Sequence, residues 1–133
     1  MTTINQVLEA VRSPMVTLAT TFSVPLVIDN SPTVDFESVW IRAVTAVNSA
    51  TVVTAPDRYR WSGSLEVSIY APRATGDQQV LLYATLLQQQ YRGLGGSSPI
   101  WRVESVSLVG TSVYGDGWSG RTVRISWTAD LLA

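Results

Sequence analysis

Hydrophobic positions near the start of the chain follow a helical period. A stripe of apolar residues with this spacing comprises Ile4, Val7, Leu8 and Val11. Thr3 and Gln6 have the spacing of a capping box, which places the helix start there. Ser13-Pro14 then stops or kinks the helix, because proline cannot donate the amide hydrogen bond. Residues 15–22 fit either a second helical segment or a strand, so both remain open.

The next segments alternate between apolar and polar positions, as strands do. A short apolar run at residues 24–28 ends in a turn-rich cluster. Strands are predicted over residues 39–47, 59–71, 100–109 and 121–129. Residues 48–56 are small and polar, which predicts a loop or a long flexible hairpin arm. Residues 94–99 predict a loop.

Residues 76–92 form the clearest helical pattern, and Gly93 stands where a left-handed C-cap is wanted. One face carries Val80, Tyr83, Ala84, Leu87 and Tyr91. Leu82 and Leu86 fall nearly opposite, although the surface helix of a monomer rarely needs two apolar faces. We therefore expect another helix or a neighbouring subunit to cover the second face.

The order helix, strands, helix, strands predicts the fold class. No repeat or linker divides the 133 residues, so a single domain is expected over residues 1–133. An antiparallel-dominated sheet with two helices packed on one face satisfies this order. The sequence therefore predicts a small α+β sandwich.

Charged residues make up only 14% of the chain, against about 25% in an ordinary soluble domain. All nine basic residues are arginine, a residue that is enriched at protein interfaces. Coverage of the surface by partner proteins explains both facts, and so does a genomic base composition that favours Arg and Ala codons. The net charge of −1 argues against autonomous binding to DNA.

Missing residue types exclude most enzyme mechanisms. The chain has no His, Cys or Lys, so it lacks the usual general base, thiolate, zinc ligands and Schiff-base amine. Gly115, Gly117 and Gly120 spell a dinucleotide-binding fingerprint, but a strand pattern follows where a helix is required. We therefore expect no catalytic residues, no cofactor and no metal.

Acidic residues gather in the segment that follows the short apolar run. Asp29, Asp35 and Glu37 lie close together and could hydrolyse glycosides or hold a cation, but a solvated acidic loop explains them better. The N-terminus lacks the pattern of a signal peptide, and no apolar run is long enough to span a bilayer. A soluble protein made inside the cell is expected.

Aromatic residues and arginines gather in one segment. Cations and aromatics alternate in Arg58, Tyr59, Arg60 and Trp61. This pattern is found in grooves that bind nucleic acid and in the anchor residues of protein interfaces. It is equally compatible with a plain structural role, in which Trp61 lies in the core and the arginines lie at a solvated strand end. The other tryptophans are expected to supply core or interface mass, and they are Trp40, Trp101, Trp118 and Trp127.

Several segments in order resemble the phage tail terminator-like family. They are residues 24–30 (VPLVIDN), 35–44 (DFESVWIRAV), 63–93 (GSLEVSIYAPRATGDQQVLLYATLLQQQYRG) and the closing Gly117-Trp118, 123–127 and Ala129-Asp130. The resemblance covers most of the chain and depends on order and spacing. The chain departs from it at Ser13-Pro14 and at a longer loop over residues 48–57.

This resemblance implies a structural virion protein located at the head-proximal end of the tail and assembled in the host cytoplasm. It implies a homo-oligomeric ring, typically a hexamer, that binds the tail tube protein and the head–tail connector in the neck. DNA is then only cargo passing through the channel. Alternatives are another neck or tube component of the same fold, a small ligand- or glycan-binding module, or a carboxylate-based hydrolase.

A ring needs two different adhesive surfaces on each subunit, because its contacts are heterologous. We expect the helix at residues 76–92 and the arm at residues 48–60 to carry these contacts. The candidate interface residues are Leu82, Leu86, Arg58, Tyr59, Arg60 and Trp118. The channel wall is expected to avoid dense positive charge.

Overall fold

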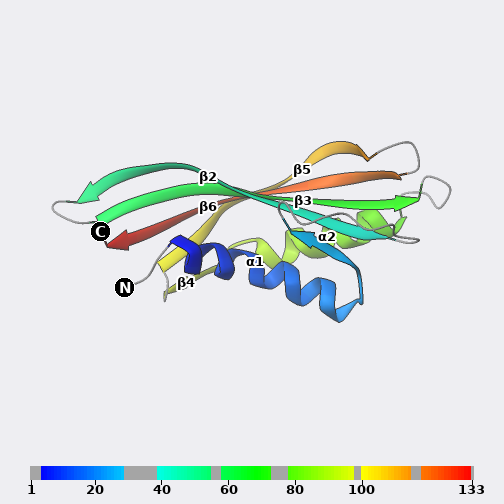
Figure 1. Ribbon diagram of the computed structural model, residues 1–133, viewed down its shortest axis with the longest axis horizontal. Coiled ribbons are helices and arrows are strands. Elements are labelled where there is room, and N and C mark those ends of the chain that lie inside the picture. The colour runs from blue at the N-terminus through cyan, green and yellow to red at the C-terminus, as the bar shows by residue number, and fades with distance from the viewer. Residues whose placement is uncertain are drawn as a thin grey trace.

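The computed structural model describes residues 4–28, 39–54, 58–72, 78–97, 100–114 and 118–132. In chain order, its elements are α1 (Ile4–Thr21), β1 (Leu26–Ile28), β2 (Trp40–Thr54), β3 (Arg58–Pro72), α2 (Gln78–Tyr91), β4 (Gly95–Ser97), β5 (Ile100–Tyr114) and β6 (Trp118–Leu132). The strands form one twisted sheet, and both helices lie on the same face of it (Figure 1). The predicted α+β class is confirmed.

The strand order across the sheet is β1-β2-β3-β6-β5-β4. Four neighbouring pairs are antiparallel, and β1 alone runs parallel to its neighbour β2. The sheet is therefore mixed but dominated by antiparallel pairing, as expected. The four central strands have 15 residues each, which corresponds to about 50 Å of extended chain.

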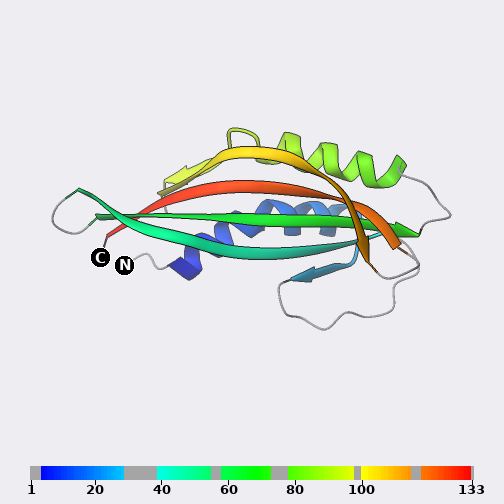
Figure 2. The same cartoon turned by 90° about the horizontal axis from the view of Figure 1, so that it is seen from above.

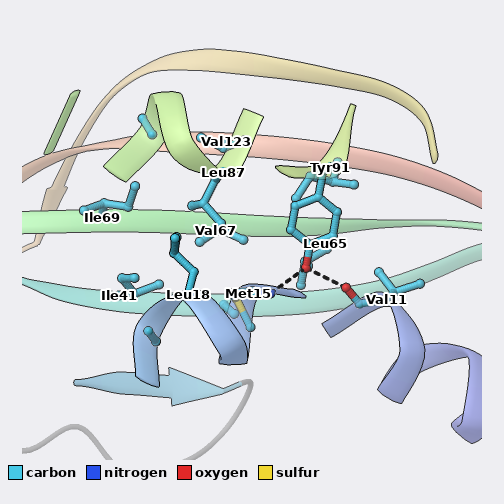
Figure 3. Close-up of a cluster of buried hydrophobic side chains, with 14 of the residues drawn as sticks. Val11, Met15, Leu18, Ile41, Leu65, Val67, Ile69, Leu87, Tyr91 and Val123 are labelled. Carbon is cyan, nitrogen blue, oxygen red and sulfur yellow. Dashed lines mark hydrogen bonds between the residues drawn. The ribbon is translucent and has the colours of Figure 1, made fainter. Parts of the chain in front are cut away.

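The core lies between the sheet and the two helices (Figure 3). Each helix supplies one buried stripe with helical spacing: Val7, Val11, Met15 and Leu18 from α1, and Val80, Ala84, Leu87 and Tyr91 from α2. The strands supply alternate residues, among them Ile41, Leu65, Val67, Ile69, Val123, Ile125 and Trp127. Gly63 leaves space for the Trp127 ring, because an added Cβ would overlap that ring and the carbonyl oxygen of Ala46.

Helix α1 continues through Pro14 to Thr21, so the helical prediction for residues 15–22 is confirmed and the strand alternative is wrong. Tyr91 of α2 supports the chain at this point. Its hydroxyl donates to the Val11 carbonyl oxygen at 2.6 Å and accepts from the Met15 amide at 3.1 Å (Figure 3). Pro14 therefore does not stop the helix, and the contact between the two helices stabilises α1 at this proline.

The predicted strands are all present, but most are longer than their patterns indicate. Residues 48–54 continue β2 as a hairpin arm, so the loop alternative for them is wrong. The predicted loop at residues 94–99 contains the short strand β4, which the pattern did not indicate. Helix α2 ends as expected, since Gly93 adopts a left-handed φ of 72°.

Candidate assembly surfaces

The face of the sheet opposite the helices is lined by small polar side chains along its central strands. Residues alternate between the two faces of a strand, so those between Leu65, Val67 and Ile69 point away from the core. We call this surface the open face, and its central residues are Ser64, Glu66, Ser68, Thr122, Arg124 and Ser126. The Ser68 and Thr122 hydroxyls are hydrogen-bonded at 2.8 Å. No helix covers this face in the described part of the chain (Figure 1).

Three ion pairs join charges on the open face, between neighbouring strands or within one strand, and Arg42 of β2 also lies on this face, opposite Ser68 of β3. The pairs are Arg124 with Glu66 at 2.7 Å, Arg60 with Asp130 at 2.9 Å, and Arg102 with Glu104 at 2.7 Å. Each pair joins one positive to one negative group, so the three pairs together contribute no net charge. Exposed pairs of this kind add little to stability, because water screens the attraction between their charges. Their main effect is to neutralise the surface.

Two of these pairs shift the pKa of their members. The hydrogen bond from Thr128 lowers the pKa of the Glu104 carboxyl, and the Arg102 guanidinium lowers it further. The hydrogen bond with Asp130 and its negative charge raise the pKa of Arg60. Arg60 also makes a second hydrogen bond to Asp130 at 3.2 Å, so this pair is bidentate. Both shifts favour the ionised forms of Glu104 and Arg60.

An aromatic cluster lies on the same side of the sheet at the other end of β3. Trp40 and Tyr70 are buried there together with Val27, and Trp118 packs against them. The Trp118 ring meets the Trp40 ring edge-on, with 6.2 Å between centroids. Trp118, a candidate interface residue, is thus half-buried in a local cluster. Its role as a subunit contact stays a prediction.

The two apolar faces expected for α2 are unequal. Leu82 is 53% exposed, so its side chain is available to a partner, whereas Leu86 is half-buried and packs against the core. Phe22, at the end of α1, is 46% exposed, and its ring meets Tyr83 of α2 at 5.5 Å between centroids. Helix α2 carries no charged residue from Gln78 to Tyr91. Its outer side is therefore an uncharged surface with exposed leucine.

The interleaved arginine and aromatic residues of β3 do not form one groove. Tyr59 and Trp61 are half-buried on the side of the strand opposite to Arg60, whose guanidinium is engaged by Asp130. The Arg58 side chain lies outside the described residues. Stacking of successive bases on aromatics lined by free arginines is therefore not the arrangement found here. Tyr59 and Arg60 remain candidates for subunit contacts.

Sequence patterns missed the two open edges of the sheet. β1 pairs with β2 only at residues 41–43, and β4 pairs with β5 only at residues 100–102. We call residues 44–54 the β2 edge and residues 104–114 the β5 edge; no described strand pairs with either on its outer side. Figure 2 shows that the short strands cover opposite ends of the sheet. Among the described residues, each subunit therefore presents two different long edges.

Sites for small ligands are weakly developed in the described residues. A hollow of about 80 Å³ is lined by Ile100, Trp101, Arg102, Thr128, Ala129 and Asp130. Binding pockets for drug-sized ligands are typically about 300–1,000 Å³. No group of three or more His, Cys, Asp or Glu suited to a metal occurs among the residues described. Within the same residues, neither helix has the length and hydropathy to cross a bilayer.

Two candidate sites from the sequence, the acidic segment and the glycine motif, lie wholly or partly outside the described residues. Asp29, Asp35 and Glu37 lie outside it, as do Gly115 and Gly117. Gly120 lies within β6, and the strand continues after it without a helix. The geometry that a dinucleotide-binding loop requires is therefore not formed after Gly120.

Comparisons with known proteins show a shared fold and do not indicate an activity. No family model matches the sequence, and no curated protein matches it. Eighteen chains of solved structures match the fold. One of them, whose name states no function, covers 97% of this chain and 96% of its own, with a TM-score of 0.73 and 16% sequence identity. At that identity the likeness shows the fold alone.

Proposed function

We propose that this chain is the subunit of a ring that ends the tail tube of a bacteriophage and joins it to the neck connector. The ring is hexameric by the resemblance of the sequence to tail terminator-like proteins. The proposal assigns the protein a structural role in the virion. Its partners are further copies of itself, the tail tube protein and the head–tail connector.

The observation that carries this proposal is the polar character of the open face, on which ion pairs neutralise most of the described charges. A channel that passes DNA should be wetted by polar groups without holding phosphates through free cations. Hydroxyl side chains and the paired charges Glu66–Arg124 and Arg60–Asp130 have this character. We therefore assign the open face to the channel wall.

The helix side of the subunit supports the same arrangement. It offers exposed apolar groups such as Leu82 and Phe22 and an α2 without charge, which suits contact with other protein surfaces. One side of the subunit then faces passing DNA, and the rest is available to neighbouring subunits, tube and connector. This division also gives a reason for the low charge of the whole chain.

Imaging and mass measurement of the purified protein test the proposal. We expect light scattering after size exclusion to give one discrete oligomer, and negative-stain images to show rings. Added to polymerised tail tubes, the protein should occupy one end and stop further growth. Binding along the whole tube would favour a tube component of the same fold, and a monomer that ignores tubes at high concentration would overturn the proposal.

A further inference from the structure

The β2 edge lacks the features that normally keep an exposed strand from pairing with another chain. From Val44 to Thr54 it contains no charged residue, no proline and no glycine, and it is rich in valine, threonine and alanine. Proteins that stay monomeric usually protect such an edge with lysine, proline, a bulge toward solvent or a covering element. The one such feature here is bulging, since the register shifts between Val47 and Ser49 and again between Val52 and Thr54.

The β5 edge offers a complementary strand on the other side of the same subunit. Residues 105–114 are also uncharged, so no repulsion separates the two edges. Their lengths are similar, because each long strand is covered by a short one over only three residues. A strand edge is recognised through its backbone hydrogen bonds, so its natural occupant is another strand.

We propose that the β2 edge pairs antiparallel with the β5 edge of the next copy, so that strand addition makes the joint between subunits. This inference rests on the proposed ring and names the contact that would build it. Pairing of unlike edges is heterologous and can continue from copy to copy until a ring closes. Each subunit then pairs its β2 edge with one neighbour and its β5 edge with the other.

The backbone groups of the two edges are in phase for this pairing. The Ile41 amide donates outward to Pro25, so alternate residues from Ile41, including Val47, direct their amides to the outer side of β2. On β5, the Val103 amide donates outward to Leu94. Counting the register shift between Val103 and Ser105, Leu108 also directs its amide outward.

The side chains at these positions agree with the backbone. Val47 is 41% exposed and Leu108 is 40% exposed, and each pairs within its own sheet opposite a residue of the helix-covered face. Placing Val47 beside Leu108 of the next copy keeps the two helix-covered faces continuous. Both apolar side chains would then be shielded from water on the same side.

Helix α2 is placed to cover the joint. It lies beyond β5 when the sheet is seen from above (Figure 2), and below the sheet when seen from the side (Figure 1). A strand added to the β5 edge would therefore lie over α2. The helix that carries Leu82 then contributes to the contact between copies, which connects the expected helix interface with the open edge.

Backbone and charge substitutions in the full chain test the pairing. Val47→Pro removes an outward amide, and proline is tolerated on edge strands. Leu108→Lys places a charge on the opposite edge, and Val16→Lys is a matched control because Val16 is 39% exposed on α1. We expect the two edge variants to remain folded by circular dichroism but to lose the ring, while the control keeps it.

Crosslinking identifies which strands meet, since the chain has no cysteine of its own. An equimolar mixture of Val47→Cys and Leu108→Cys copies should give a crosslinked dimer with a short bismaleimide, and Val16→Cys mixed with Leu108→Cys should not. Crosslinking of Val47→Cys copies with one another would overturn the pairing with β5 in favour of a two-fold contact. Cysteine keeps the backbone amide that proline removes, so these assays decide the matter if Val47→Pro fails to fold.

The outcomes separate this inference from the proposed function. If Val47→Pro and Leu108→Lys still form rings that cap tubes, the edge pairing is wrong and the ring function stands. If the unmodified protein forms no oligomer at any concentration and also ignores tubes, both are overturned. Loss of rings in the edge variants alone, together with the mixed crosslink, supports the joint as described.

Discussion

The hydroxyl of Tyr91 permits a sharp test of how the helical layer is held together. In an uninterrupted helix the Met15 amide would bond directly to the Val11 carbonyl, four residues earlier. Here the Tyr91 hydroxyl stands between them, accepting from one at 3.1 Å and donating to the other at 2.6 Å. Pro14 lies within this turn, and Gln90 donates to its carbonyl oxygen at 3.0 Å. The end of α2 thus binds the irregular turn of α1.

Tyr91→Phe should reduce the free energy of unfolding by about 2 kcal/mol. The substitution keeps the buried ring and removes both hydrogen bonds, and an unsatisfied buried amide or carbonyl costs about 1–3 kcal/mol. If the Met15 amide and the Val11 carbonyl move closer together in the variant, the loss of unfolding free energy will lie toward the lower end of this range. For a chain of 133 residues, about 2 kcal/mol corresponds to a fall of about 7 °C in Tm.

Urea unfolding followed by tryptophan fluorescence measures this change. Tyr83→Phe is the control, because Tyr83 is half-buried on the same helix and packs through its ring against Phe22; its expected cost is below about 0.5 kcal/mol. Pro14→Ala would let the helix form its own bonds, so Tyr91→Phe should cost less in that background. Equal costs for the two tyrosine variants, or strict additivity with Pro14→Ala, would refute the reasoning.

The same hydroxyl predicts a pH dependence. Burial raises the pKa of Tyr91 above its ordinary value. A raised folded-state pKa means that the stabilising contribution is complete below the unfolded-state pKa of about 10 and is lost as pH rises above it. Unfolding free energy should therefore fall between about pH 10 and 11 more steeply in the unmodified protein than in Tyr91→Phe. Identical slopes would contradict a buried, neutral hydroxyl.

Two further predictions concern the surfaces assigned to DNA passage and to partners. Glu66→Gln leaves Arg124 without its carboxylate partner, so rings of this variant should retain duplex DNA in low-salt gel shifts. Rings of the control Glu9→Gln, which is altered on an exposed face of α1, should not retain it. Equal retention of DNA by both variants would contradict the assignment of the open face to the channel wall. At protein concentrations that dissociate any oligomer, Leu82→Glu should leave the melting temperature within about 2 °C, because Leu82 is exposed in the single subunit. Leu86→Glu should lower it by more than about 5 °C, because Leu86 packs against the core. Equal melting temperatures for the two leucine variants would contradict this difference in burial.

Local patterns predicted most of the secondary structure because they act over a few residues. The stripe of α2 and the glycine after it were recognised from spacing alone, and so were the four long strands. The uncertain segment at residues 15–22 had two valid local periods. In the folded chain this segment is helical, and the Met15 amide donates to the hydroxyl of Tyr91, 76 residues away. No local pattern contains information about such a distant contact.

The candidate surfaces were only partly accessible from the sequence. Leu82 and Leu86 occupy similar positions in the pattern, but the helix is rotated so that one is exposed and the other touches the core. The strand β4 has the sequence Gly-Gly-Ser and shows no alternation, so the length of the β5 edge could not be foreseen. Edges depend on where a neighbouring strand stops, which is a property of the folded sheet.

By itself, the sequence determined the types of most elements, the shortage of charge and the absence of histidine, cysteine and lysine. The tertiary structure alone decided which charges meet, since Glu66 and Arg124 are 58 residues apart and Arg60 and Asp130 are 70 apart. It also decided which strand edges remain uncovered. The physical reason is that side-chain period and propensity act along the chain, whereas register brings distant residues together across the sheet.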